Sequence, residues 1–437
     1  ISNDWLLKED LSLPELTYPL VLYICPKCFL AQTAQYKKGF EVFSDNYVYF
    51  SSYSSYWLKH ARKYVKNIIK RLYLNKSSFV LEVASNDGYL LTNFLDYDIT
   101  CLGIEPTKST AMEAIKKGVP TIIDFFNLEL VDSIIKDNKK ADLVVANNVL
   151  AHVPDINDLI SSLKKILEVE GTITIEFPHL LNLVELNQFD TIYHEHFYYF
   201  SILNLSNALN KYNLSIYDIE ELETHGGSIR AFITHANNKT DQNNKKNVNT
   251  VLKREISYGM NSLEYYKKIV AKSFDVKLKA LEYLINKKME GKKIIAFGAA
   301  AKGNTFLNYC GIKRDLIDVV IDETPHKIGK YLPQSKIPIV QFSAIEELKP
   351  NIIIILPWNH KSEILEKLSF TKQWDCEIVV FIPKLEVLWR CYRKYIMSSI
   401  DEARKAPYTY VPPIRQEYNS NDLIITVIID CYYGLNL

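Results

Sequence analysis

The chain has 437 residues, too many for a single hydrophobic core, and this length predicts two or three domains. Its 52 Lys and Arg residues balance 51 Asp and Glu residues, and no basic stripe carries interleaved aromatic residues, so the composition argues against a nucleic-acid-binding protein. No apolar run reaches the length of a membrane span, and the seven cysteines, mostly isolated, do not form a disulfide framework. We therefore expect a cytoplasmic protein that does not enter a membrane.

The N-terminal stretch, residues 1–60, contains a C-x-x-C pair, Cys25 and Cys28, after a predicted strand over Tyr18 to Ile24. Two thiolates at this spacing form half of a tetrahedral zinc site, but no other cysteine supplies a second pair. We interpret residues 1–60 as a truncated zinc-binding domain in which zinc itself is doubtful. A redox dithiol and two inert cysteines are the alternatives.

The central stretch, residues 61–240, begins with an apolar run, Phe79 to Val83, that breaks into a polar turn at Ala84 to Gly88. Apolar residues at helical spacing then follow over Tyr89 to Leu95. Strand, tight turn and helix open a nucleotide-binding α/β domain, and the turn is where a cofactor meets backbone N–H groups. Only 14 glycines occur in the chain, so we expect Gly88 to lie where a side chain would obstruct. An ordinary βα turn without a ligand is the alternative.

Each further strand of this domain ends in a polar residue or is directly followed by one. We expect these strands at Ile99 to Ile104, Thr121 to Asp124, Ala141 to Asn148 and Gly171 to Glu176. Such strand ends face the ligand crevice of a doubly wound sheet, and an acidic residue after the second strand can accept both ribose hydroxyls. Because no G-x-G-x-x-G pyrophosphate loop occurs, S-adenosylmethionine (SAM) fits better than NAD. The predicted cofactor-binding residues are Glu82, Ser85, Asn86, Asp87, Gly88, Glu105, Asp124 and Asn147.

Side chains capable of acid–base chemistry are most concentrated in Tyr193-His194-Glu195-His196, with aromatic residues on either side. A metal site would use His194 and His196 on one face of a strand, but no third ligand is evident nearby. An acid–base cluster would use one histidine as the base, with Glu195 and Tyr193 setting its tautomer and binding substrate. A polar loop of hydrogen-bonded histidines is the third possibility. His152, which follows the fourth strand, is expected to overlook the reactive end of the cofactor.

The C-terminal half repeats the α/β pattern. A polar linker at 237–249 precedes a predicted helical stretch over Val251 to Met289, and Lys293 to Gly298 then restarts a strand and glycine turn. We interpret residues 241–390 as a second Rossmann-like domain in which Lys302 and Asn304, at a helix start, hold the nucleotide or diphosphate of a substrate. A purely structural repeat is the alternative. Residues 391–437 form an appended tail to which we assign no function.

Several motifs together resemble a known family, the three-domain sugar-nucleotide C-methyltransferases of deoxysugar biosynthesis. They are residues 79–88, the Tyr-x-Glu-His of 193–196 and His225-Gly226-Gly227-Ser228. The C-terminal half adds Phe297 to Thr305, Asn308 to Gly311, Asp322 to Gly329, Tyr331-Leu332-Pro333 and Leu356 to Asn359. The resemblance covers roughly the first nine tenths of the chain and is more specific than any one motif.

This resemblance implies a class I methyltransferase domain that moves a methyl group from SAM to a ring carbon beside the ketone of a nucleoside-diphosphate 4-keto-deoxysugar. It implies that His196 is the base, that Tyr193, Glu195 and His152 surround the sugar, and that Tyr47 closes over the site. His225 is expected to bind substrate.

The chain departs from the family at two points. Ala84 stands where many members have glycine, and the first cysteine pair of the family's zinc site is absent. We expect a monomer or weak oligomer with no nucleic-acid partner. A sugar-nucleotide isomerase or dehydratase and a non-catalytic sugar-nucleotide-binding protein are the alternative functions.

Overall fold

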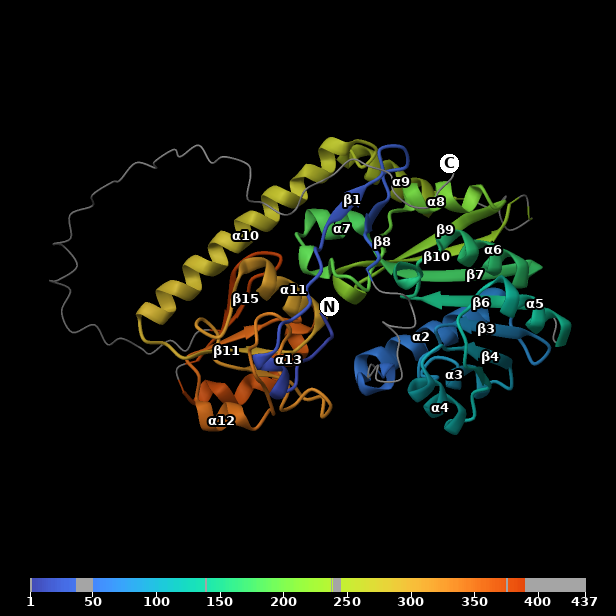
Figure 1. Cartoon of the computed structure of the whole chain (residues 1–437). Coiled ribbons are helices and arrows are strands. Elements are labelled where there is room, and N and C mark those ends of the chain that lie inside the picture. Colours follow the sequence, from blue (N-terminus) through green and yellow to red (C-terminus); the bar gives the residue numbers. More distant parts are fainter. Residues whose placement is uncertain are drawn as a thin grey trace. The chain divides into compact units, whose positions relative to one another are not determined.

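The computed structural model describes residues 2–36, 50–137, 140–236, 238, 245–374 and 376–389 (Figure 1). The described chain forms two compact units, and the boundary between them falls within one long helix, α10 (Leu263–Met289). The first unit is Leu22–Ser273, whereas the second contains residues from Phe274 onward together with the N-terminal segment Ser2–Val21. The predictions for Tyr47 and for residues 391–437 lie outside the described residues.

The first unit is organised around a seven-stranded sheet with the order β5-β4-β3-β6-β7-β10-β9. The first five strands of that order are parallel, and β10 is antiparallel to both β7 and β9. The chain leaves β3 for β4 on one side and β6 lies on the other, so the ligand crevice is expected at the carboxyl ends of β3 and β6. The strands are β3 (Phe79–Val83), β4 (Thr100–Ile104), β5 (Thr121–Ile122), β6 (Ala141–Asn147), β7 (Leu167–Pro178), β9 (Leu214–Leu222) and β10 (Ser228–His235).

The sequence explains why the central strands lie inside. All five residues of β3 are buried, as expected of a strand covered by helices on both faces, and its run of apolar and β-branched residues suits that place. The helical elements of the unit are η2 (Ser51–Tyr53), α2 (Ser55–Leu72), α3 (Thr92–Leu95), α4 (Lys108–Lys116), α5 (Leu128–Asp137), η3 (Leu150–His152), α6 (Ile156–Ile166), α7 (Leu180–Glu185), η4 (Phe189–Thr191), α8 (Ile202–Asn210), η5 (Thr224–Gly226) and α9 (Lys246–Tyr258).

Three local predictions are wrong in detail. The helix expected over Tyr89 to Leu95 is a single turn at Thr92–Leu95, because the preceding apolar residues form turns that bury their side chains in the core. The helix expected over Val251 to Met289 is two helices, since Gly259 ends α9 in the left-handed conformation (φ +89°). The strand expected over Tyr18 to Ile24 is only β1 (Leu22–Ile24).

A small antiparallel sheet completes the first unit. β1 pairs with β2 (Ala31–Thr33), and β2 pairs with β8 (Tyr198–Tyr199), the strand that directly follows the Tyr-His-Glu-His segment. The N-terminal hairpin therefore packs beside the Tyr193 to His196 segment, which carries the predicted catalytic residues.

The second unit has a six-stranded sheet with the order β13-β12-β11-β14-β15-β16. The first five strands are parallel, and β16 pairs antiparallel with β15. Its elements are β11 (Ile294–Phe297), α11 (Ala301–Cys310), β12 (Val320–Ile321), β13 (Ile339–Val340), α12 (Ala344–Leu348), β14 (Ile352–Ile355), η6 (Trp358–His360), α13 (Lys361–Lys367), η7 (Leu368–Gln373), β15 (Glu377–Val380) and β16 (Glu386–Trp389).

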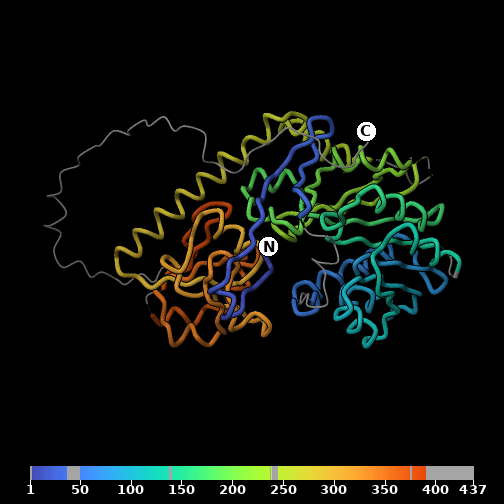
Figure 2. The backbone as a smooth tube through the Cα atoms, in the orientation of Figure 1, coloured from blue at the N-terminus to red at the C-terminus, as the bar shows by residue number. Residues whose placement is uncertain are grey.

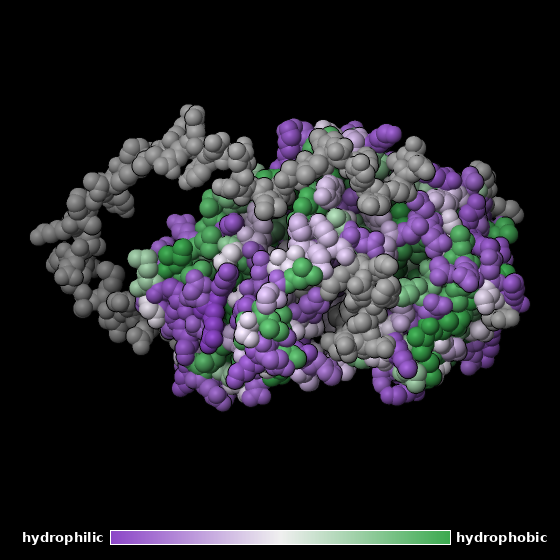
Figure 3. Space-filling model, in the orientation of Figure 1, coloured by the Kyte–Doolittle hydropathy of each residue, from purple (hydrophilic) through white to green (hydrophobic). Residues whose placement is uncertain are grey.

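The N-terminal segment belongs to this second unit, as the blue start of the tube in Figure 2 illustrates. It contains η1 (Glu9–Ser12), and its Leu6 exchanges two backbone hydrogen bonds of 2.9 Å with Tyr331. Hydrophilic residues predominate among the described residues on the face shown in Figure 3. Within the described ranges, no helix combines the length and the apolar character needed to cross a membrane.

Candidate active site

The turn after β3 holds several buried oxygen atoms that have no hydrogen-bond partner within the described part of the chain. They are Oε2 of Glu82, Oγ of Ser85, Oδ1 of Asp87 and, at the end of β6, Oδ1 of Asn147. Buried polar atoms are usually paired, so four unpaired oxygens beside the β3–β6 crevice indicate a place for a ligand that donates hydrogen bonds. These four residues therefore suit a ligand with hydroxyl and amino groups.

Three carboxyl groups gather at the same turn. Both oxygens of Glu105 accept backbone hydrogen bonds of 2.9 Å, one from Asn86 and one from Thr107. Burial, with the nearby carboxyl groups of Glu105 and Asp87, raises the pKa of Glu82 well above its usual value. A positively charged ligand would relieve this repulsion between carboxylates.

Gly88 is needed for packing against α4. Its φ of +74° is left-handed, and a Cβ atom there would lie 3.0 Å from the Val119 side chain and 3.1 Å from the Ala114 side chain. A side chain at position 88 would therefore clash with α4 and with the residue Val119 that follows it, as the scarcity of glycine led us to expect of this position. Asp124 lies exposed after β5 and accepts a 2.7 Å hydrogen bond from the backbone of Phe125.

The short helix η2 covers the turn after β3. The backbone N–H of Ser51 donates to Oδ1 of Asn86 (2.9 Å), and both the N–H and the hydroxyl of Ser52 bond Oδ2 of Asp87. Lys117 pairs with the same Asp87 oxygen at 3.1 Å. The two serines were not among the predicted site residues, although the hydroxyl-rich run around them was a signal for a segment over a polar ligand.

The imidazole of His196 is held at both ring nitrogens. Its Nδ1 lies 3.1 Å from the carbonyl oxygen of Thr191, and its Nε2 lies 2.8 Å from the hydroxyl of Tyr193. A carbonyl only accepts, so in the neutral ring Nδ1 carries the hydrogen and the lone pair of Nε2 accepts from the tyrosine. The hydroxyl of Thr33 also donates to the carbonyl oxygen of His196 (2.7 Å), a contact that sequence reasoning missed.

His152 packs against His196, with ring centroids 4.7 Å apart. Its Nδ1 donates to the carbonyl oxygen of Glu195 (2.8 Å), and burial lowers its pKa to about 4, so its ring is neutral near pH 7. The backbone of Phe197 also bonds that of Ala151, in η3 just beyond β6 (2.7 Å). Tyr193, Glu195, His196 and His152 are thus brought together next to the strand that carries Asn147.

The other predicted histidine, His225, lies in the loop before β10. Its ring meets the edge of Trp57 with centroids 5.2 Å apart, and Trp57 also stacks on His60 (4.9 Å). His60 in turn lies 3.0 Å from the buried carboxylate of Glu176, at the carboxyl end of β7. Trp57, His60 and Glu176 were not predicted site residues, because their partners are far away in sequence.

The two metal hypotheses are not supported. His194 and Glu195 lie in a turn and not on a strand, and His194 contacts the ring of Tyr36 (5.8 Å). Cys25 and Cys28 lie in the β1–β2 turn, with Cys25 packed in the hydrophobic core. Among the described residues, no group of three or more His, Cys, Asp or Glu side chains is arranged to hold a metal ion. These two thiols alone do not fit a four-ligand structural zinc site.

The predicted nucleotide-binding residues lie in the second unit. Lys302 is in the first turn of α11, with its Nζ 4.9 Å from the ring centroid of Trp358. Asn304 is buried, and its Oδ1 has no hydrogen-bond partner within the described part of the chain. Both follow the glycine turn at Gly298, where a Cβ atom would lie 2.5 Å from Pro357.

Two family models match the chain in tandem. A methyltransferase domain model matches residues 56–219, and a C-methyltransferase C-terminal domain model matches residues 223–383. A C-methyltransferase from Streptomyces niveus, NovU, is 30% identical over 380 residues, which cover 87% of this chain and 90% of that protein. The chain belongs to the C-methyltransferase family. The resemblance drawn from the sequence motifs is therefore confirmed.

This C-methyltransferase is SAM-dependent, and its first unit has the Rossmann-like fold of class I methyltransferases. Two solved structures are more distant. A SAM-dependent methyltransferase from Clostridium acetobutylicum is 13% identical, covering 41% of this chain and 92% of that chain with a TM-score of 0.34. Magnesium protoporphyrin IX methyltransferase from Synechocystis, with bound S-adenosylhomocysteine (SAH), is 16% identical. The match covers 45% of this chain and 92% of that chain, with a TM-score of 0.33. The family assignment rests on the models and on NovU.

Proposed function

We propose that this C-methyltransferase methylates a ring carbon next to the ketone of a nucleoside-diphosphate 4-keto-deoxysugar, with His196 as the general base. The observation that carries the proposal is the tautomer of His196. Thr191 holds its Nδ1 hydrogen, so Nε2 is the nitrogen that can accept a proton. NovU is named a C-methyltransferase, and the sugar substrate is carried over from the family resemblance.

The residues around His196 suit proton removal beside a ketone. A C–H bond becomes acidic when the neighbouring carbonyl delocalises the negative charge into an enolate. Nε2 of His196 takes this proton, and the hydroxyl of Tyr193 turns from Nε2 to donate to the enolate oxygen. His152 stays neutral because burial lowers its pKa to about 4, so it adds no competing positive charge beside His196.

SAM, when bound, supplies an electrophilic methyl group on a sulfonium and leaves as a neutral thioether. Glu82, Ser85, Asp87 and Asn147 would hold it, because each offers a buried oxygen without a partner within the described part of the chain. The carboxylates near this turn favour the positive charge of the sulfonium. The electron pair of the enolate forms the new carbon–carbon bond.

Lys302 and Asn304 remain the proposed contacts to the nucleotide of the substrate. A lysine at the start of α11 and a buried, unpaired amide oxygen support this role, because a diphosphate accepts and a base donates hydrogen bonds. The cytoplasmic location and the monomeric or weakly associating state stay predictions from the sequence.

The test is exchange of the substrate's α-proton with deuterated water, followed by mass spectrometry. A panel of nucleoside-diphosphate 4-keto-sugars is incubated with enzyme and SAH, so that deprotonation occurs without methyl transfer. We expect exchange with the wild-type enzyme and a loss of about 10²–10⁴-fold in His196→Asn. Calorimetry with SAH should show unchanged cofactor binding in that variant. Normal exchange in His196→Asn would show that another residue is the base.

A further inference from the structure

The loop between β9 and β10 has an unusual backbone. Three consecutive residues have positive φ angles: His225 (53°), Gly226 (84°) and Gly227 (113°). The left-handed conformation is unfavourable for a residue with a side chain, so the surroundings must hold His225 in it. The strain lies at a residue that the family resemblance predicts to bind substrate.

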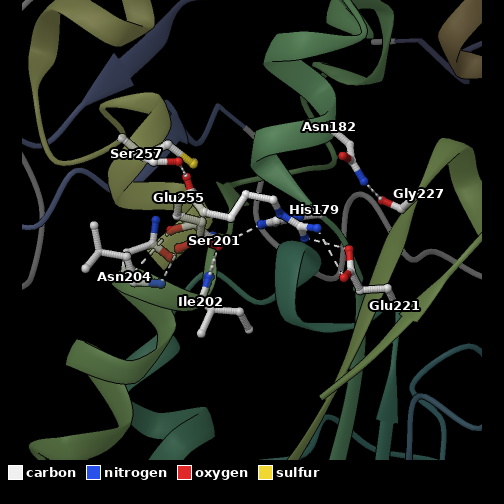
Figure 4. A network of polar contacts seen from close by, with 12 residues as sticks. His179, Asn182, Ser201, Ile202, Asn204, Glu221, Gly227, Glu255 and Ser257 are labelled. Atoms are coloured by element: carbon white, nitrogen blue, oxygen red, sulfur yellow. Dashed lines mark hydrogen bonds and ion pairs between the residues drawn. The ribbon is translucent and has the colours of Figure 1, made fainter. Parts of the chain in front are cut away.

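Residues of the segment after β7 donate hydrogen bonds to the carbonyl oxygens of this loop. Gln188 donates its side-chain amide to Gly226 (2.7 Å), while the backbone of His179 (3.1 Å) and the side chain of Asn182 (3.3 Å) donate to Gly227. Figure 4 shows the side chain of Asn182 directed at Gly227. A Cβ atom on Gly227 would lie 2.3 Å from the Asn182 amide nitrogen, so this loop fits its neighbours only with glycine there.

The segment that makes these bonds is itself held by a buried carboxylate. Glu255, on α9, is fully buried, and its oxygens accept from the ring of His179 (2.7 Å) and from the backbone of Ile202 (2.7 Å) and Leu203 (2.8 Å) at the start of α8 (Figure 4). A carboxylate at a helix N-terminus is favoured electrostatically. The His225 loop therefore rests on a fixed support.

Glu176 also holds this loop. Its side chain is completely buried, and Oε1 accepts a hydrogen bond from the hydroxyl of Thr224 (2.9 Å), the residue before His225. Oε2 accepts from Arg230 (2.5 Å) and lies 3.0 Å from His60. Burial alone would raise the pKa of Glu176, but the bond to His60 and the charge of Arg230 lower it to about 2.

These contacts close a ring of residues. Glu176 bonds Thr224, which precedes His225; the ring of His225 meets Trp57; Trp57 stacks on His60; and His60 returns to Glu176. Both the backbone and the ring of His225 are thus connected to one carboxylate.

The backbone of Glu176 also contacts the end of β6, the strand with the predicted cofactor-binding residue Asn147. Its carbonyl oxygen accepts from the N–H of Asn148 (2.7 Å), at the end of the strand that carries Asn147. One residue therefore contacts both the predicted cofactor strand and the ring of residues around His225.

We propose that Glu176 is a positioning residue that sets the orientation of His225 toward the substrate through Thr224 on one side and through His60 and Trp57 on the other. The importance of this orientation for turnover rests on the proposed function of His225. The positioning itself is independent of the reaction and can be measured without substrate.

Thr224→Val is the sharpest test, because it removes one hydroxyl and leaves the charged groups and the side-chain volume nearly unchanged. Thr224→Ser restores the hydroxyl. Thr234→Val is the matched control, since Thr234 is also buried, in β10, and its hydroxyl bonds the carbonyl of Gly171 (2.9 Å), outside the ring around His225.

The first readout is the ¹H–¹³C spectrum of enzyme labelled at histidine Cε1, with His225 and His60 assigned from His225→Gln and His60→Gln. The indole of Trp57 displaces both signals from their random-coil positions. We expect Thr224→Val to shift the His225 signal and leave that of His60, Glu176→Gln to shift both, and Thr224→Ser and Thr234→Val to match wild type. An unmoved His225 signal in folded Thr224→Val would overturn the proposal.

The second readout separates binding from chemistry. With a 4-keto-sugar accepted by the wild-type enzyme, we expect Thr224→Val to lower kcat/KM about tenfold, the size of one lost hydrogen bond. The Kd for SAH should stay within about twofold, because the backbone contact to Asn148 is untouched. Failure of every sugar with the wild-type enzyme would disprove the proposed substrate, whereas the spectra would still decide the positioning of His225.

Discussion

The hydroxyl of Tyr193 lies 2.8 Å from Nε2 of His196, the nitrogen proposed to accept the substrate proton. Because the carbonyl oxygen of Thr191 accepts from Nδ1 at 3.1 Å, the tyrosine donates its hydrogen to the lone pair of Nε2. The proposed base is thus already hydrogen-bonded within the protein. In the proposed mechanism, the substrate displaces this phenol, which then lies beside the ketone.

Replacing Tyr193 with Phe should therefore have two effects. Loss of the donor to the enolate oxygen should lower kcat by about 10²–10³-fold. Loss of the hydrogen bond to Nε2 should change the acidic limb of the kcat/KM profile, because Tyr193 contacts the proposed base directly. The measurement is the pH–rate profile. Tyr198→Phe is the control, because the hydroxyl of Tyr198 bonds the carbonyl of Pro154 (2.8 Å) and not His196. An unchanged profile in Tyr193→Phe would argue against the assigned tautomer.

His152 should make the protein less stable in acid. Burial lowers its pKa from 6.5 to about 4, so between these pH values the folded protein binds fewer protons than the unfolded chain. Neutral His152 therefore favours the folded state fully above pH 6.5. As the pH falls to 4, the free energy of unfolding decreases by up to about 3 kcal/mol. Urea unfolding at pH 7.5 and pH 5 measures the change. His152→Gln should flatten this dependence, and His235→Gln, on β10, should keep it.

Glu82 should oppose stability and support cofactor binding. It is buried with two other carboxyl groups nearby, which raises its pKa, so Glu82→Gln should raise the melting temperature of the ligand-free enzyme at pH 8. The positive charge of bound SAM would favour the carboxylate form of Glu82, and Gln cannot take that form. We therefore expect the affinity for SAM to fall more than that for SAH, which lacks the positive charge. Calorimetry with both ligands tests this, and an equal loss for the two would contradict the charge argument.

Thr33 should support His196 from the N-terminal hairpin. Its buried hydroxyl donates to the carbonyl of His196 (2.7 Å), and its N–H donates to the carbonyl of Phe197 (2.9 Å). Thr33→Val should lower kcat several-fold to tenfold, as expected for one buried hydrogen bond, and Thr33→Ser should recover most of it. Methyl-transfer rates at saturating SAM provide the measurement. Equal rates in Thr33→Val and wild type would restrict the hairpin to a structural role.

Much of the fold could be read from local pattern. Parallel strands buried on both faces are continuous apolar runs, so β3, β4, β6 and β7 were predicted close to their observed positions. Polar residues at their ends, such as Glu105 and Asn147, were found for the same reason. The helix expected from Tyr89 was wrong because its apolar residues serve burial in turns and not a helical face.

The sequence by itself determined the α/β class, the family motifs and the residue types at the strand ends, because these depend on neighbours along the chain. Only the tertiary structure decided that Thr33 supports His196, that Thr191 sets its tautomer, and that His225 is connected to Glu176. The hydroxyl of Thr33 lies 163 positions from its partner, and His60 lies 116 positions from Glu176. A side chain in a strand or helix has the same local pattern whether or not it meets such a partner, so these relationships appear only when packing brings distant segments together.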